Sequence, residues 1–233
     1  GEKDWVIRKE NGIKYGYHLT ECMFSSGNIN ERRRMGKVVS EGEVVIDLFC
    51  GIGGFHQALR SFGCECNLAC DIDKACRDNY ELNYGITPVE DVKKINPDEI
   101  EDLDIICGGY PCQAFSNAGK KKCFDDDRGL LFDEIIRIAK VKKPKFMFLE
   151  NVKHILKVDG GKVIEYVKQK LDANNYTLQL FNMSPHNYGI PQQRERIYHV
   201  CVRKDIYNGV DIKLPEIENN MIDLDKYMLK ENE

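Results

Sequence analysis

The feature that most constrains this chain is an alternation of short apolar runs with helical patterns, beginning at residue 43. The apolar runs occupy residues 44–49, 65–70, 103–107 and 145–150. The helical patterns cover residues 53–63, 73–85, 129–141 and 161–173. Continuous apolar strands that alternate with helices predict a parallel sheet with helices on both faces. Two last runs, 176–184 and 196–203, predict an antiparallel pair. We therefore expect an α/β fold whose mixed, mostly parallel sheet ends in an antiparallel closing strand.

The length of 233 residues suits one sizeable α/β domain. We divide the chain into an N-terminal segment at 1–42, a main domain at 43–207 and an acidic stretch at 208–233. The last stretch is expected to be a tail or the start of a further region. Hydrophobic residues make up 42% of the chain, and no apolar run approaches the roughly 20 residues of a membrane span. The charged N-terminus does not resemble a signal peptide, so we expect a cytoplasmic protein that does not bind a membrane.

The ten cysteines and the net charge of −4 argue against two further classes: metal-binding proteins and proteins that bind nucleic acid by charge alone. The cysteines show no spacing typical of a zinc site, and several lie in apolar runs, which indicates reduced and mostly buried thiols and no bound metal. The negative net charge argues against a protein that grips nucleic acid by bulk charge alone. It leaves room for a local basic surface, for which Arg32–Arg34 and Lys120–Lys122 are candidates.

A glycine-rich turn joins the first apolar run to its helix in the stretch DLFCGIGGF, residues 47–55. Glycines at such a turn let the backbone approach a ligand, and the first amides of the helix are free to donate. Asp71 follows the next run and suits a ribose diol, and Asp91 follows the turn after it. Either acid alone would more often be a helix cap, but together they favour a cofactor that carries a nucleoside.

A single cysteine, Cys112, lies in GGYPCQAFS directly after the strand at 103–107. Pro111 restricts the backbone before it, and ligands of α/β sheets bind at the carboxyl ends of the strands. A thiol with a lowered pKa is a strong nucleophile. Glu150 ends the neighbouring run and is expected to lie beside Cys112. Arg194 and Arg196 are two residues apart and are expected to project to one face, where guanidinium groups suit a carboxylate or a phosphate.

Taken in order, these stretches resemble the motifs of the cytosine-C5 methyltransferases. DLFCGIGGF resembles the family's cofactor motif, and GGYPCQAFS resembles its catalytic motif almost letter for letter. DDRGLLFDEIIRI, ENV and QQRER resemble the next three signatures, so that the resemblance covers about residues 43–204. The serine of QAFS and the following NAGKKK are more similar to the DNA-modifying bacterial branch than to the tRNA-modifying branch.

The resemblance implies a Rossmann-like S-adenosylmethionine-dependent methyltransferase fold and a DNA (cytosine-5-)-methyltransferase of the restriction-modification type. Such an enzyme flips a cytosine out of DNA, methylates it through a covalent adduct with Cys112 and releases S-adenosylhomocysteine. The catalytic residues that it implies are Cys112, Glu150, Arg194 and Arg196. The cofactor-binding residues that it implies are Asn28, Asp47, Phe49, Gly51, Gly53, Asp71, Ile72, Asp91 and Pro111. The stretch from Ala114 to Arg128 is implied to be a mobile lid.

Two departures from the family pattern leave alternatives open. The family carries a target-recognition domain and then a Gly-Asn motif after the arginine motif, and we expect both to be missing from this chain. Gly27 and Asn28 precede the cofactor motif instead, which suggests a circular order that packs residues 1–42 beside the cofactor. The N-terminal stretch also resembles tRNA guanine-N1 methyltransferases and wybutosine-synthesis enzymes. The alternatives are thus a tRNA cytosine methyltransferase, or a cofactor-binding subunit that is active only with a separate recognition subunit.

Overall fold

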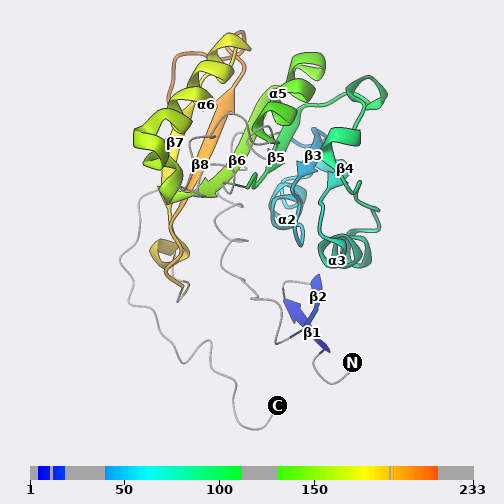
Figure 1. The fold of residues 1–233 in the computed structure, drawn as a ribbon. Helices are drawn as coiled ribbons and strands as arrows, with labels where there is room; N and C mark the ends of the chain where they lie inside the picture. Colours follow the sequence, from blue (N-terminus) through cyan, green and yellow to red (C-terminus); the bar gives the residue numbers. More distant parts are fainter. Residues whose placement is uncertain are drawn as a thin grey trace.

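A six-stranded sheet forms the centre of the protein (Figure 1). The computed structural model describes residues 5–10, 13–18, 40–111, 131–188, 190 and 192–214, and only the main chain of the first two ranges. The strand order is β4-β3-β5-β6-β8-β7. The strands are β3 (Val44–Leu48), β4 (Glu65–Cys70), β5 (Ile105–Gly108), β6 (Phe146–Val152), β7 (Gln179–Met183) and β8 (Arg196–Val202). The predicted α/β fold with a mixed sheet is confirmed.

The first four strands of the sheet order are parallel, and the last two reverse direction. β3 pairs in parallel with β4 and β5, and β5 pairs in parallel with β6. β8 runs antiparallel to both β6 and β7, which is the predicted closing pair. The carboxyl ends of β3, β4, β5 and β6 therefore meet at one edge, which we call the carboxyl edge. Because β8 is reversed, its first residue, Arg196, lies at that same edge, opposite Val152.

In the part of the chain that the structure describes, four helices connect the strands where the sequence predicts them. They are α2 (Gly54–Arg60), α3 (Lys74–Tyr84), α5 (Leu131–Lys142) and α6 (Lys162–Ala173). Short 3-10 turns fill the connections at η2 (Val92–Lys94), η3 (Pro97–Glu99), η4 (Lys153–Leu156), η5 (Val158–Gly161) and η6 (Pro185–Tyr188). The Asp73 carboxylate caps α3 by accepting from the amides of Ala75 and Cys76, and Gly85 closes the helix in a left-handed conformation.

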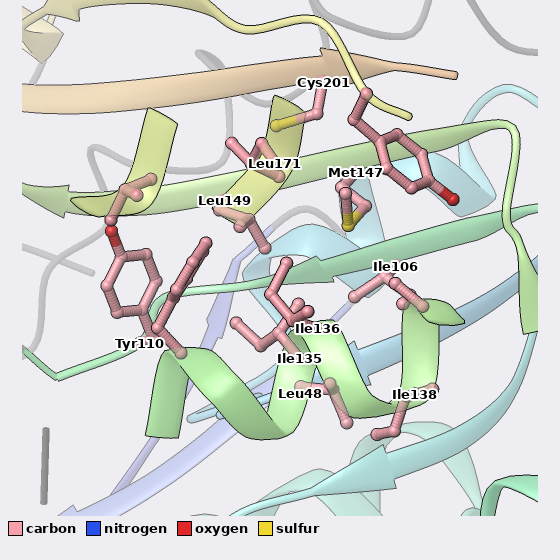
Figure 2. Packing of buried hydrophobic residues seen from close by; sticks show 14 of the residues in the cluster. Leu48, Ile106, Tyr110, Ile135, Ile136, Ile138, Met147, Leu149, Leu171 and Cys201 are labelled. Atoms are coloured by element: carbon pink, nitrogen blue, oxygen red, sulfur yellow. The ribbon is translucent and has the colours of Figure 1, made fainter. Parts of the chain in front are cut away.

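Two apolar clusters cover the opposite faces of the sheet, because successive strand residues point to opposite sides. Ile106 and Leu149 pack on one face against Ile135 of α5 and Leu171 of α6 (Figure 2). Phe148 and its neighbours pack on the other face against Phe55 and Leu59 of α2. The prediction of helices on both faces is therefore confirmed.

Residues 5–10 and 13–18 form an antiparallel pair of strands that the alternation of runs and helices does not predict. β1 (Trp5–Glu10) pairs antiparallel with β2 (Ile13–His18), and Glu10 is paired with Ile13. The sequence did contain a signal for this pair, because an Asn-Gly dipeptide between two alternating runs is typical of a hairpin. β2 lies against α3 (Figure 1). Gly27 and Asn28 lie outside the described residues, so the circular order stays a prediction, as do the domain limits at 1–42, 43–207 and 208–233.

Within the described part of the chain, seven cysteines are free thiols, and no helix has the length and hydropathy of a membrane span. Nor does this part group three or more side chains of the types that hold a metal ion.

Candidate active site at the carboxyl edge

The glycine-rich turn after β3 is wound tightly against the end of β4. The Cys50 amide donates to the Cys70 carbonyl at 2.9 Å, and the Gly53 amide donates to the Cys50 carbonyl at 2.9 Å. Phe49, Gly51 and Gly53 all have positive φ angles, of 57°, 53° and 82°. A side chain at Gly51 would meet no atom within 4 Å, so the turn is open on that side. The turn thus presents bare backbone to the carboxyl edge, as the sequence predicts.

Asp71 links this turn to the next strand. Its Oδ2 accepts from the Gly51 amide at 2.8 Å, and its Oδ1 accepts from the Asp73 amide at 2.9 Å. Each carboxylate oxygen has a second lone pair with which a ligand hydroxyl can bond. Ile72, the next residue, is 83% exposed although it is apolar. The two predicted cofactor residues therefore lie together beside the turn, and Ile72 offers an apolar surface that the fold itself does not use.

The other two predicted cofactor acids accept hydrogen bonds from the protein's own backbone, and Asp91 has the capping role that the sequence left open. Asp91 caps η2 by accepting from the Lys93 amide at 2.9 Å. The Asp71 amide donates to the Val89 carbonyl at 3.0 Å, which brings the chain before Asp91 to the end of β4. Asp47 is 1% exposed, and its Oδ2 accepts from the His56 amide at 3.3 Å. Asp91 therefore lies near the carboxyl edge, whereas Asp47 supports the turn from inside the protein.

The chain leaves β5 through two glycines, of which Gly108 has no room for a side chain and Gly109 has little. A Cβ atom on Gly108 would lie 1.8 Å from the Leu48 carbonyl oxygen, and one on Gly109 would lie 3.2 Å from Oε2 of Glu150. Pro111 is half-buried at the end of this described stretch. Cys112 itself lies outside the described residues. The main chain that leads to it nevertheless passes between the glycine-rich turn and the carboxylate of Glu150.

Glu150 and Arg196 form an ion pair that is largely shielded from solvent. Nε of Arg196 lies 3.0 Å from Oε1 of Glu150, and the two side chains are only 15% and 13% exposed. β6 and β8 bring them together, because Glu150 pairs with Tyr198 and Val152 with Arg196. The planar guanidinium holds the carboxylate and retains other N–H groups, so this arrangement can orient a planar polar ligand.

Arg194 lies just before β8 and also belongs to this edge. Its amide donates to Oγ of Ser184 at 3.1 Å, which ties it to the end of β7. Arg194 and Arg196 are both partly buried, and Glu195 between them is exposed and pairs with Lys153 at 2.6 Å. This alternation agrees with the expectation that the two arginines share a face.

Asn151 is a site residue that the sequence motifs indicate only as part of the ENV stretch. It is 2% exposed, and its side-chain amide donates to the Tyr110 carbonyl at 2.9 Å. This hydrogen bond fixes the backbone two residues before Cys112. A polar residue inside an otherwise apolar strand was the available signal, because a buried amide needs a partner.

Several other cysteines are unsuited to act as nucleophiles because they are buried. The pKa of Cys64 is raised to about 11 and those of Cys66 and Cys70 to about 12, in each case mainly because burial disfavours the thiolate. Burial and the nearby carboxylates of Asp47 and Asp71 also raise the pKa of Cys50, in the glycine-rich turn. These four thiols are protonated near neutral pH and do not provide a reactive thiolate.

A cavity of about 460 Å³ lies elsewhere on the molecule. Its lining includes Val44, the first residue of β3, and Asp102, which precedes β5, together with Leu68 in the second half of β4. Neither Asp71 nor Glu150 lines this cavity.

Comparison with known proteins shows the family of this chain. A family model described as "C-5 cytosine-specific DNA methylase" matches residues 44–232. The Type II methyltransferase M.HhaI of Haemophilus parahaemolyticus is 47% identical over 161 residues, which are 69% of this chain and 49% of that protein. The Type II methyltransferase M1.ScrFI of Lactococcus lactis subsp. cremoris is 43% identical, over 73% of this chain and 44% of that protein. The chain spans about half the length of these curated relatives.

Solved structures show the same fold. The Dnmt2 methyltransferase of S. pombe superposes with a TM-score of 0.60 at 25% identity, over 70% of this chain and 51% of that one. TYW2 of M. jannaschii, solved in complex with AdoMet, superposes with a TM-score of 0.53 at 20% identity, over 87% of this chain and 88% of that one. The second likeness is one of fold alone.

Proposed function

Because the chain belongs to the C-5 cytosine-specific DNA methylase family, we propose that it carries the catalytic part of a DNA cytosine-C5 methyltransferase. The proposed reaction transfers a methyl group from S-adenosylmethionine to C5 of a cytosine in DNA and leaves S-adenosylhomocysteine. The observation that carries the proposal is the Glu150–Arg196 pair, which lies against Gly109, three residues before Cys112.

The residues at the glycine turn fit S-adenosylmethionine. The turn is open at Gly51, and the Asp71 carboxylate beside it has lone pairs left for the two ribose hydroxyls. Exposed Ile72 would pack against the adenine ring, and Asp91 would accept from its amino group. Phe49, Gly53 and Pro111 would complete the surroundings of the cofactor, with Asn28 reaching it only in the circular order. When bound there, the cofactor supplies an electrophilic methyl group on a sulfonium.

The chemistry assigned to the chain's own residues begins with Cys112. C5 of cytosine is a poor nucleophile, and addition of the Cys112 thiolate to C6 makes an enamine whose C5 can attack the methyl group. Glu150 would hold or protonate N3 of the ring, which stabilises this adduct. A bond from sulfur to C6 forms, C5 gains the methyl group, and loss of the C5 proton then expels Cys112 as the thiolate. Arg196 would orient Glu150 and the base, and Arg194 would hold the neighbouring loop.

A cytosine inside a duplex cannot reach this edge unless it leaves the base stack, so base flipping is part of the proposal. The substrate that we favour is DNA, since the family model that matches the chain is described as a C-5 cytosine-specific DNA methylase. A tRNA substrate is the second candidate, favoured by the resemblance of the N-terminal stretch to tRNA-modifying enzymes. The third candidate is a catalytic subunit that acts only with a separate recognition subunit. Base-edge contacts specify the target sequence, and that second subunit would make them.

The test uses the 233-residue chain, S-adenosylmethionine with a labelled methyl group, and either duplex DNA or tRNA. We expect label in DNA as 5-methylcytosine, and Cys112→Ser should abolish it while cofactor binding survives. Cys64→Ser is the matched control, since Cys64 is a protonated thiol just before β4, at the opposite end of the sheet from Glu150, and its replacement should keep normal turnover. Label in tRNA alone would reject the DNA substrate, and normal turnover of Cys112→Ser would reject the covalent step. Activity that appears only with an added partner would support the subunit alternative.

A further inference from the structure

Three aromatic side chains pack together beneath the glycine-rich turn. His56 comes from α2, and Tyr80 and Tyr84 come from α3. The His56 ring is stacked on the Tyr84 ring with centroids 3.9 Å apart and planes at 21°, and the Tyr80 and Tyr84 centroids are 4.7 Å apart. Tyr80 is fully buried and His56 is 7% exposed. We call these three residues the aromatic support.

The aromatic support reaches the turn through the hydroxyl group of Tyr84. This hydroxyl donates to the Gly53 carbonyl at 3.0 Å, and the same carbonyl accepts from the Gln57 amide at 2.9 Å. The ring also fills the space beside Gly53, where an added Cβ would lie 2.2 Å from Cε2 of Tyr84. Gly53 therefore has its left-handed conformation, with φ of 82°, directly beside the Tyr84 ring.

The orientation of the Tyr84 ring is fixed in turn by the other two residues. Nδ1 of His56 lies 2.7 Å from the Tyr80 hydroxyl. Burial lowers the pKa of His56 to about 4, so its ring is neutral near neutral pH and Nδ1 can accept. Burial raises the pKa of Tyr80, which keeps its phenol protonated and able to donate. This buried hydrogen bond locks His56 in place, and the stacked face of His56 limits the positions that Tyr84 can occupy.

We propose that Tyr84 is a positioning residue for cofactor binding, whose hydroxyl holds the Gly53 carbonyl and so fixes the shape of the glycine turn. The inference rests on the proposed function, because it assumes that the cofactor binds at this turn. Asp71 fixes one end of the turn by accepting from the Gly51 amide, and Tyr84 fixes the other end from α3. A turn that is already in its bound shape spends less binding free energy on ordering, which raises affinity without any direct contact.

The test is Tyr84→Phe in the full chain, which removes the hydroxyl and keeps the ring that packs on Gly53. We expect the Kd for S-adenosylhomocysteine, measured by calorimetry, to rise about fivefold, the equivalent of one hydrogen bond. The KM for S-adenosylmethionine should rise by a similar factor, and kcat should change less than about twofold. His56→Phe keeps a stacked ring and removes the bond to Tyr80, and we expect it to weaken binding by about two- to threefold.

Tyr176→Phe is the matched control. The Tyr176 hydroxyl also donates to a backbone carbonyl, that of Pro144 at 2.7 Å, but this pair lies at the start of β6, away from the turn. Both substitutions should lower the thermal midpoint, and only Tyr84→Phe should change the Kd. Equal Kd values for wild type and Tyr84→Phe would overturn the inference, as would an equal loss of affinity in Tyr176→Phe. Should Tyr84→Phe fail to fold, an unchanged Kd in His56→Phe would overturn it instead. If the wild-type chain binds neither cofactor nor product, the proposed function fails first.

Discussion

At the scale of single residues, the site depends on charged side chains that are largely shielded from solvent. Glu150 and Arg196 are 13% and 15% exposed and share a 3.0 Å contact, so each holds the other at the carboxyl edge. Removing one partner of such a pair leaves a poorly solvated charge. Glu150→Gln should therefore lower methyl transfer by about a hundredfold, within the range for loss of an acid–base group. The rate at saturating cofactor should fall while the Kd for S-adenosylhomocysteine stays within about twofold, and an unchanged rate would contradict the role given to Glu150.

Two buried histidines make the stability of the protein depend on pH. Burial lowers the pKa of His56 and that of His199 to about 4, against 6.5 for an exposed histidine. The unfolded chain therefore binds more protons than the folded chain between about pH 6.5 and pH 4, and stability falls as the pH falls through that window. Between pH 7 and pH 5 each histidine should cost about 2 kcal/mol of unfolding free energy.

Denaturant unfolding at the two pH values measures this effect. His199→Leu should reduce the loss between pH 7 and pH 5 by about 2 kcal/mol relative to wild type. His186→Gln is the control, because His186 is exposed and its replacement should leave the loss unchanged. If His199→Leu lost as much unfolding free energy between pH 7 and pH 5 as the wild type does, this histidine would not be buried in its neutral form.

At the scale of elements, β6 both carries Glu150 and fixes the neighbouring strand. The Asn151 side chain donates to the Tyr110 carbonyl at 2.9 Å, across the exit of β5. Asn151→Ala should lower the free energy of unfolding by about 1–3 kcal/mol, because it leaves a buried carbonyl without that donor. We expect methyl transfer to fall as well, since the chain before Cys112 loses its attachment.

Asn182→Ala is the control for this prediction, because Asn182 is an exposed residue of β7 whose amide lies 3.3 Å from Glu195. It should stay within about 0.5 kcal/mol of wild type in the same unfolding experiment. If both variants lost the same small amount of stability, the hydrogen bond to Tyr110 would not be holding β5 and β6 together.

At the scale of the whole molecule, ligand binding should stabilise the entire domain, because the turn and Asp71 join two core strands. With S-adenosylhomocysteine at about a hundred times its Kd, linkage predicts about 2.7 kcal/mol of added stability. For a chain of this size that corresponds to a rise of about 5–10 °C in thermal midpoint. Asp71→Ala should lose most of the rise, and a full rise in that variant would remove Asp71 from the cofactor site.

The sequence alone determined the order of strands and helices, the mixed sheet and the residues that gather at its carboxyl edge. It could do so because parallel strands are buried on both faces and read as continuous apolar runs, and because the glycine, cysteine and arginine motifs are local. Asp71, Glu150 and Arg196 were found in this way. The antiparallel pair at 5–10 and 13–18 was missed although its Asn-Gly signal was local, since the alternation after residue 43 dominated the interpretation.

Only the tertiary structure decided which residues support these motifs. The Glu150–Arg196 ion pair depends on the register of β6 against β8, and the Tyr84–Gly53 bond joins residues 31 positions apart. Nothing in the local sequence distinguishes Asp47, buried beneath the turn, from Asp71, which lies at its open side. Burial and long-range pairing are properties of the packed chain, so the roles of Asp47, Asn151 and Tyr84 became visible only in the folded protein.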